Sequence, residues 1–185
     1  LATFKTALVF LESEALHGES ATQRKHALMA LLDYQKYHGY DLADFLTHYL
    51  KAYAEAEEET LDVLIQLSES IPALPEACFK VLYHWLTLPA ENLRRGAMYI
   101  IKPHMTHHAD DLMALLSHEL WFVRQSALEL LAPLQTQPVI KAIQAALTDR
   151  DQDVRIMAVS LVGQMQTPER LDWLVNVLEN GYREI

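Results

Sequence analysis

The stretch that decides the fold is LTDRDQDVRIMA, residues 147–158, because other segments of the chain repeat its second half without a gap. These segments are LRRGA at 93–97 and VRQSA at 123–127, and they align with VRIMA at 154–158 at spacings of 30 and 31 residues. A fourth segment, QRKHA at 23–27, fits the same frame with glutamine in the apolar position. Self-similarity at a fixed period of this length is the signature of stacked structural repeats.

Apolar residues continue each copy at offsets of 4, 7, 8 and 11 from its first residue, which is the spacing of one helix face. In the copy that begins at Val154 these positions hold Ala158, Leu161, Val162 and Met165. A small residue such as the recurring alanine lets a neighbouring helix approach closely. Another helix with its own apolar stripe precedes each copy, so the repeating unit is a helical hairpin. One hairpin cannot bury both faces alone, and the copies must therefore stack.

The remaining sequence also predicts an all-α protein, because strand signals are almost absent and proline and glycine fall at short intervals. Ser20 is a natural N-cap and Gly39 a C-terminal stop, while Pro133 is expected to kink or fray the last turn of its helix. Helices are expected over 3–16, 21–37, 42–54, 56–68, 76–87, 90–102, 108–117, 120–134, 138–148, 152–166 and 168–180.

Residues 147–158 resemble a HEAT repeat, in the short form of about 30 residues also found in phycobilisome-lyase-type proteins. Asp149, Val154, Arg155 and Ala158 occupy the positions of the family pattern. The resemblance is strong at 138–166, good at 108–134 and 75–102, and weak at 3–38 and 41–70. It implies a right-handed α-α superhelix, a HEAT-like solenoid of about five helical hairpins plus a terminal helix. We expect a single solenoid domain over 1–185, divergent in 1–72 and regular in 73–185, that forms part of a longer protein.

The resemblance also implies a ladder of bonds between repeats, from the helix arginine to the aspartate of a hairpin turn. This chain keeps Arg94, Arg124 and Arg155, but Leu88 and His118 replace the aspartate in two copies. An unpaired buried guanidinium is costly. Some of these arginines must therefore bond to backbone carbonyls or to other carboxylates.

The composition excludes several classes of protein. Of 185 residues, 51% are hydrophobic and 22% are charged, which is too apolar for intrinsic disorder. The lone Cys78 cannot form an internal disulfide, and no apolar run approaches the roughly 18 residues of a membrane span. We therefore expect a soluble cytoplasmic protein that does not bind membranes.

The net charge of −10 comes from 25 acidic and 15 basic residues, and the basic residues are scattered rather than clustered. Scattered basic residues argue against nucleic-acid binding. The acidic excess lies in the N-terminal half, around Glu55, Glu57, Glu58, Glu59 and Asp62. The first turn of a helix over 56–68 favours such charges, and the excess also predicts a partner with a basic surface.

No motif for catalysis is evident in the sequence. His104 and His108 have the spacing of a zinc-ligand pair and Asp111 could add an oxygen, but Pro103 makes the segment read as a link between hairpins. Cys78 lies at a core-facing position, where a thiol behaves as a small hydrophobe. The sequence therefore predicts no metal site, no cofactor and no enzymatic activity.

The leading hypothesis is a non-enzymatic scaffold or adaptor that binds a protein or peptide through its concave face. In a HEAT-type stack the second helix of each hairpin lines that face, and Trp121 with Phe122 form a contact patch or else fill space within the stack. The predicted partner-binding residues are Arg95, Tyr99, Lys102, Trp121, Phe122, Gln125, Glu129, Ser160 and Gln164. The alternatives are a HEAT-like enzyme, either a bilin lyase or isomerase or a DNA glycosylase of alkylated bases, and a regulatory or spacer domain of a larger polypeptide.

Overall fold

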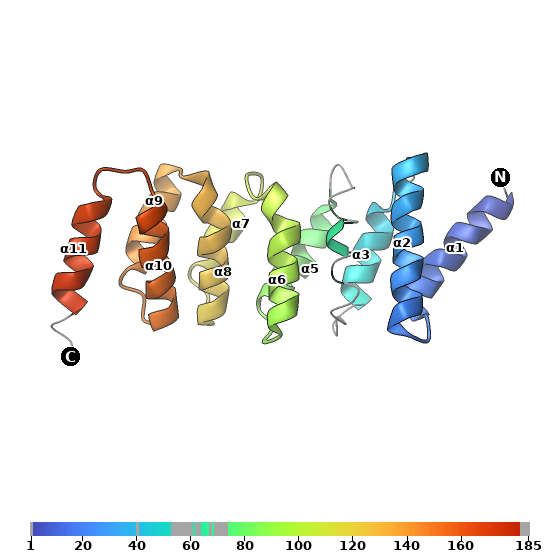
Figure 1. Cartoon of the computed structure of the whole chain (residues 1–185), viewed down its shortest axis with the longest axis horizontal. Helices are drawn as coiled ribbons and strands as arrows, with labels where there is room; N and C mark the ends of the chain where they lie inside the picture. Colours follow the sequence, from blue (N-terminus) through green and yellow to red (C-terminus); the bar gives the residue numbers. More distant parts are fainter. Residues whose placement is uncertain are drawn as a thin grey trace. The chain divides into compact units, whose positions relative to one another are not determined.

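The protein is described by a computed structural model that covers residues 2–39, 41–52, 61, 64–66, 68 and 74–181. Within these ranges the chain is all-α, and its helices pack in neighbouring pairs (Figure 1), which confirms the predicted fold class. The chain divides into two compact units, residues 1–103 and 104–185. Each unit has a core of its own and is described separately.

In the described residues of the N-terminal unit, two hairpins are clear. Helices α1 (Ala2–His17) and α2 (Ala21–His38) pack against each other, as do α5 (Glu76–Leu86) and α6 (Glu91–Ile101). Helix α3 (Ala43–Ala52) packs against α5. The helix expected over 56–68 lies mostly outside the described residues.

The caps of α2 follow the sequence prediction. The Ser20 hydroxyl accepts a hydrogen bond from the Gln23 backbone N–H at 3.2 Å, and the Gln23 side chain accepts one from the Ser20 backbone N–H at 3.0 Å. This capping box satisfies two backbone donors that the first turn leaves unpaired. Gly39 ends the helix with φ of 64°, a left-handed conformation that glycine adopts without a steric penalty.

Over residues 104–181, the C-terminal unit has two hairpins followed by a further helix. Helix α7 (Ala109–Leu115) packs with α8 (Trp121–Leu131), and α9 (Gln137–Ala146) packs with α10 (Gln152–Gln164). Helices α8 and α10 also pack against each other, and they lie on the near side of this unit in Figure 1. Helix α11 (Arg170–Gly181) contacts α10. Most predicted helix ends agree with these bounds within two residues.

Two short 3-10 helices follow the second helices of their hairpins. The first, η1 (Lys102–His104), follows α6, and the second, η2 (Ala132–Leu134), follows α8. Each contains a proline at its centre, Pro103 or Pro133. Proline has no N–H and its ring clashes with the carbonyl four residues earlier, so an α-helix cannot continue through it. The expected disturbance at Pro133 is confirmed.

The residues that recur in the repeat frame of the sequence form the core of the structure. The alanine at offset 4 is buried in every copy, with Ala97, Ala127 and Ala158 fully shielded from solvent and Ala27 nearly so. The apolar residues at offsets 7 and 8 are buried beside it in α6, α8 and α10. Small alanines at the centre of each contact therefore allow the close approach of helices that the sequence predicts.

The recurring arginine ties its helix to the preceding turn. Its guanidinium donates a hydrogen bond to the carbonyl oxygen six residues earlier in four copies. These pairs are Arg24 with Gly18, Arg94 with Leu88, Arg124 with His118, and Arg155 with Asp149, at N···O distances of 2.7 to 2.8 Å. The predicted bonding of these arginines to backbone carbonyls is confirmed.

Candidate protein-binding face

The turns before α8 and α10 hold these two helices in a fixed relation. Arg124 binds Asp149 through two hydrogen bonds, from Nη2 to Oδ1 at 2.6 Å and from Nε to Oδ2 at 2.9 Å. Arg150 reaches back and donates to the Glu119 carbonyl oxygen at 2.7 Å. A bidentate arginine–carboxylate pair constrains both distance and orientation. These bonds therefore fix α8 relative to α10, and the two helices form a rigid platform for a binding partner.

The charge on Asp149 is stabilised by its neighbours. Burial alone would raise the pKa of the Asp149 carboxyl group, but hydrogen bonds from Arg124 and from the Asp151 backbone N–H outweigh that effect. The charges of Arg124 and Arg150 act in the same direction, and the pKa of Asp149 falls below its usual value. The carboxylate therefore stays ionised, as the bidentate pair requires.

His118 takes the place of a turn aspartate in the preceding repeat. Its Nδ1 atom accepts a hydrogen bond from the Leu120 backbone N–H at 3.1 Å, and the Asp149 carboxylate accepts one from the Asp151 backbone N–H at 2.8 Å. Both bonds join residue i to residue i+2, which is the pattern of an Asx-turn. The histidine therefore supplies the turn acceptor but not the negative charge.

One side of the α8–α10 layer faces solvent, and we call it the α8/α10 face. Its members recur every four residues along each helix, which places them on a common stripe. They are Trp121, Gln125 and Glu129 on α8, and Ile156, Ser160 and Gln164 on α10. Trp121 is 38% exposed and Ile156 is 57% exposed, and the neighbouring Val159 is 37% exposed. Large apolar side chains thus meet water on this face.

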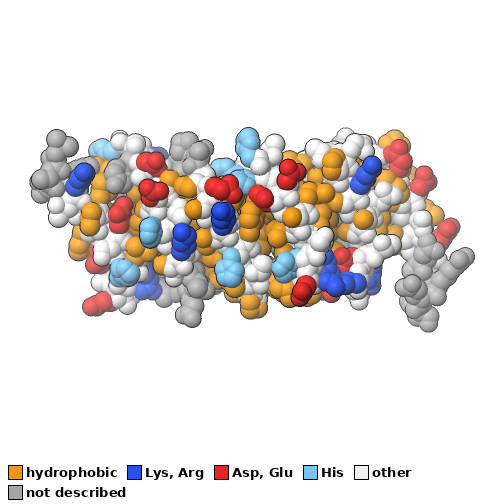
Figure 2. Space-filling model, turned by 180° about the vertical axis from the view of Figure 1, so that it is seen from behind, with side chains coloured by type: hydrophobic (Ala, Val, Ile, Leu, Met, Phe, Trp, Pro, Cys, Tyr) orange, Lys and Arg blue, Asp and Glu red, His pale blue; other side chains and the backbone are white. Residues whose placement is uncertain are grey.

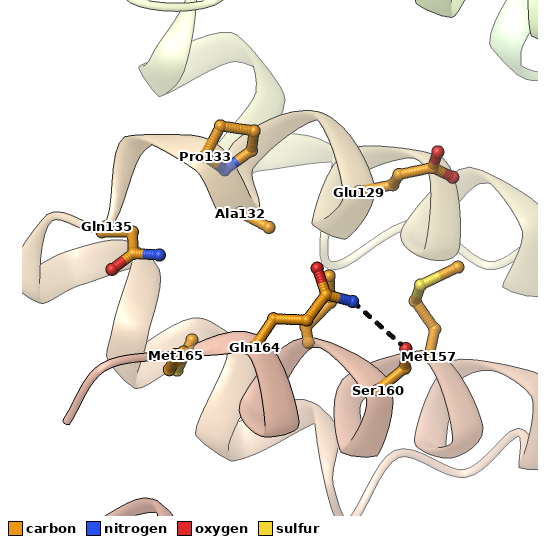
Figure 3. A pocket seen from close by; sticks show the side chains of 9 residues that line it. Glu129, Ala132, Pro133, Gln135, Met157, Ser160, Gln164 and Met165 are labelled. Atoms are coloured by element: carbon orange, nitrogen blue, oxygen red, sulfur yellow. Dashed lines mark hydrogen bonds between the residues drawn. The ribbon is translucent and has the colours of Figure 1, made fainter. Parts of the chain in front are cut away.

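An open cleft lies between the C-terminal halves of α8 and α10, and we call it the α8/α10 cleft (Figure 3). Its volume is about 540 Å³. The lining consists of apolar side chains with polar groups at the edges, and Glu129 is the one charged residue among them. The lining residues are Glu129, Ala132, Pro133, Gln135, Met157, Ser160, Leu161, Gln164 and Met165.

Pro133 explains why space opens here. It stops α8 at Leu131, and the chain turns through η2 into Gln135, whose backbone is left-handed with φ of 46°. A non-glycine residue in this conformation is strained, and among the described residues Gln135 is the one such case. On the opposite wall, Gln164 donates a hydrogen bond to the Ser160 hydroxyl at 3.4 Å. Two glutamine side chains therefore lie at the edge of the cleft, Gln135 after η2 and Gln164 at the end of α10.

The structure brings three of the predicted partner-binding residues together, since Glu129, Ser160 and Gln164 all line the cleft. Trp121 and Gln125 lie on the same face, whereas Phe122 is half-buried and packs edge-on against Trp121, with ring centroids 5.7 Å apart. The half-buried state of Phe122 agrees with the space-filling alternative. The other six lining residues were not predicted from the sequence, although Pro133 was a visible signal.

Three predicted residues belong to the N-terminal unit. Arg95 and Tyr99 lie on the exposed side of α6, where Tyr99 is 53% exposed, and Lys102 begins η1. Exposure agrees with a contact role for all three, and that role stays a prediction.

The other residues considered for chemistry lie in the core of the N-terminal unit and around η1. Cys78 is fully buried with its Sγ 3.0 Å from the Thr47 hydroxyl, and burial raises the pKa of its thiol. His104 ends η1, and His107 and His108 lie in the turn before α7, so the predicted link between helices is confirmed. Burial and the nearby His108 and His107 lower the pKa of His104.

Charged side chains show no strong segregation on the face of the protein seen in Figure 2. There, over the described residues, acidic, basic and histidine side chains are interspersed with hydrophobic ones. Every helix in the described ranges is too short or too polar to cross a membrane.

Comparisons with known proteins support the HEAT-repeat interpretation. Residues 109–185 match the family model for HEAT repeats. A solved structure titled "TOG-tubulin binding specificity promotes microtubule dynamics and mitotic spindle formation" has a similar fold, with a TM-score of 0.62 at 15% identity over 95% of this chain and 80% of that chain. No curated protein matches the sequence.

A second solved structure, an engineered protein, matches over 90% of this chain and 86% of its own chain at 14% identity, with a TM-score of 0.42. The first structure shows that this fold is shared, and the match to the family model for HEAT repeats lies within the C-terminal unit. The finer resemblance to phycobilisome-lyase-type repeats stays a prediction.

Proposed function

We propose that this chain is a non-enzymatic scaffold that binds a protein partner through the α8/α10 face. The observation that carries the proposal is the exposure of Trp121, Ile156 and Val159 on a platform held by the Arg124–Asp149 pair. Each Å² of apolar surface in water costs roughly 25 cal/mol relative to burial. Exposed apolar residues on a rigid helical face are typical of interaction surfaces.

Two further observations support a protein as the partner. The face mixes apolar side chains with amides and one carboxylate, and its stripe residues include no lysine or arginine that would favour a phosphate backbone. The protein of similar fold is named for tubulin binding, which agrees with a protein-interaction role. At 15% identity the likeness concerns the fold, so we propose a protein partner and not tubulin in particular.

The N-terminal unit contributes a second contact surface in this proposal, formed by Arg95, Tyr99 and Lys102. We also propose that the partner carries a basic surface, because the chain has a net charge of −10 and opposite charges accelerate association. The cytoplasm is the proposed site of action.

Site-specific crosslinking tests the proposed function. A photoreactive amino acid replaces Gln125 or Ser160 on the face, or Gln144 on α9 as an exposed control, in the full protein expressed in its own cells. We expect one and the same protein to crosslink from Gln125 and Ser160 but not from Gln144. Equal crosslinking from all three positions, or none from the face, would exclude the α8/α10 face as the binding surface.

A further inference from the structure

The α8/α10 cleft has the length of a short extended peptide. Its lining runs along α10 from Met157 to Met165. At about 1.5 Å per helical residue this distance is about 12 Å, which three to four extended residues span at roughly 3.3–3.6 Å each. In the view of Figure 3, Glu129 and Met157 lie toward one end and Gln135 and Met165 toward the other.

The floor of the cleft suits an apolar side chain. Met157, Leu161 and Met165 all contribute to the lining, and Leu161 and Met165 are themselves buried. Methionine is unbranched and polarizable, so it adapts to side chains of different shape. An incoming leucine, isoleucine, methionine or phenylalanine would thus find a deformable apolar contact.

Glu129 gives the cleft its charge preference. Its carboxylate is exposed at the edge and forms no ion pair with any side chain in the described part of the chain. No other lining residue is charged, so the lining carries a single negative charge. A lysine or arginine is the complementary group, and an acidic side chain would be repelled.

The two glutamines suit a peptide backbone. A primary amide presents a carbonyl acceptor and an NH₂ donor, which match the N–H and C=O groups that an extended peptide exposes. Gln164 donates to Ser160, which orients its amide, and Gln135 lies at the other edge of the cleft on a left-handed backbone. Strain of this kind persists where the surrounding structure fixes it, and such residues cluster at binding sites.

We propose that the α8/α10 cleft binds an extended peptide segment of the partner in which a lysine or arginine lies within three residues of a large apolar side chain. This inference rests on the proposed function, because it names what the α8/α10 face recognises. In the bound segment the basic group pairs with Glu129, the apolar group contacts Met157, Leu161 and Met165, and the backbone bonds to Gln135 and Gln164.

Selection from a displayed library of random 12-residue peptides tests the proposal. The baits are the full wild-type chain, Glu129→Lys, and Glu179→Lys, which makes the same charge change on α11 outside the cleft. We expect the wild type and Glu179→Lys to enrich peptides with a basic residue near an apolar one. Glu129→Lys should instead enrich acidic residues at the same spacing. Enrichment of the same peptides by all baits, or of none by any, overturns the proposal.

A second measurement tests the role of the backbone bonds. Fluorescence anisotropy of one enriched peptide should show about tenfold weaker binding for Gln135→Gly combined with Gln164→Ala. Glycine tolerates the left-handed conformation of residue 135, so this variant removes the amide without adding strain. Unchanged affinity of the double variant would contradict backbone recognition by these glutamines.

The outcomes separate this inference from the proposed function. If Gln125 and Ser160 crosslink to a partner protein while the peptide selection fails, the α8/α10 face binds proteins but the cleft does not read a basic–apolar peptide. If the crosslinking fails as well, both the inference and the proposed function are wrong.

Discussion

Arg124 meets two requirements with one side chain, because it closes its own hairpin turn and also joins that turn to the next repeat. Its Nη1 donates to the carbonyl oxygens of His118 and Glu119, while Nε and Nη2 bind Asp149. Removing the guanidinium would leave a partly buried carboxylate and two carbonyls without these donors. At the scale of single residues, this side chain therefore links two successive turns of the C-terminal unit.

We predict that Arg124→Ala lowers the free energy of unfolding by about 3–5 kcal/mol, the usual cost of removing one partner from a buried ion pair. Arg155→Ala is the matched control, since Arg155 donates to the Asp149 carbonyl oxygen and forms no ion pair in the described part of the chain. It should cost about 1 kcal/mol, the net value of a typical hydrogen bond. Urea unfolding measures both values, and equal losses would contradict the special role of the pair.

The lowered pKa of Asp149 predicts a pH dependence. A carboxyl group whose pKa falls on folding stabilises the folded state above its unfolded pKa, which is about 3.9 for aspartate. That contribution is lost as the pH falls through the lower folded value. The stability difference between wild type and Asp149→Asn should therefore be constant from pH 7 to 5 and shrink between pH 4 and 2. Urea midpoints of both proteins across this range test it, and a difference that grows on acidification would refute the assignment.

At the scale of helices, two glycines that both lie in the second helix of a hairpin have opposite roles. A Cβ atom on Gly96 of α6 would lie 2.4 Å from Leu61 Cδ1, whereas one on Gly163 of α10 would meet nothing within 4 Å. Gly96 therefore permits a close helix contact, and Gly163 is a helix position where a side chain would fit. The sequence alone does not show which of the two glycines lies at a close contact, since each is adjacent to an apolar residue.

We predict that Gly163→Ala raises the free energy of unfolding by roughly 0.5–1 kcal/mol, because alanine loses less backbone entropy in a helix. Gly96→Ala should lower it by about 1 kcal/mol, since overpacking outweighs the same helix-propensity gain. Thermal unfolding of the two variants compares them directly. Stabilisation by both substitutions would mean that Leu61 moves aside at little cost.

At the scale of the whole molecule, the repeat pattern and the spacing of proline and glycine were sufficient to predict most of the described helices and the pairing of those in the regular repeats. The repeated apolar residue, arginine and alanine identify the buried face of each second helix, because residues at fixed helical spacing contact the same neighbouring helices. The α8/α10 cleft could not be predicted in the same way. Its shape depends on how the chain leaves Pro133 and on the gap between α8 and α10, and Gln135 carries no local signal for a left-handed backbone.

The division into two compact units predicts that destabilisation stays local. In stacked repeats each element contacts mainly its neighbours, so a lost contact raises fluctuations near its own position. Arg124→Ala should increase amide hydrogen exchange in 104–181, and Leu82→Ala, which empties part of the core between α5 and its neighbours, should do so in 2–103. Exchange measured by mass spectrometry tests this, and a uniform increase along the chain after either substitution would show that the units unfold together.

The bond from each arginine to the carbonyl six residues earlier has a consequence for engineering. This bond fixes the number of residues in the turn inside a hairpin. One extra residue inserted at Glu119 would therefore move Arg124 away from the carbonyl oxygen of His118. The exposed segment at Thr106 and His107, between η1 and α7, lies in a stretch, residues 103–123, that contains no arginine to make such a bond. A reporter peptide or affinity tag inserted after Thr106 should therefore be tolerated, while the same insertion after Glu119 should prevent the C-terminal unit from folding.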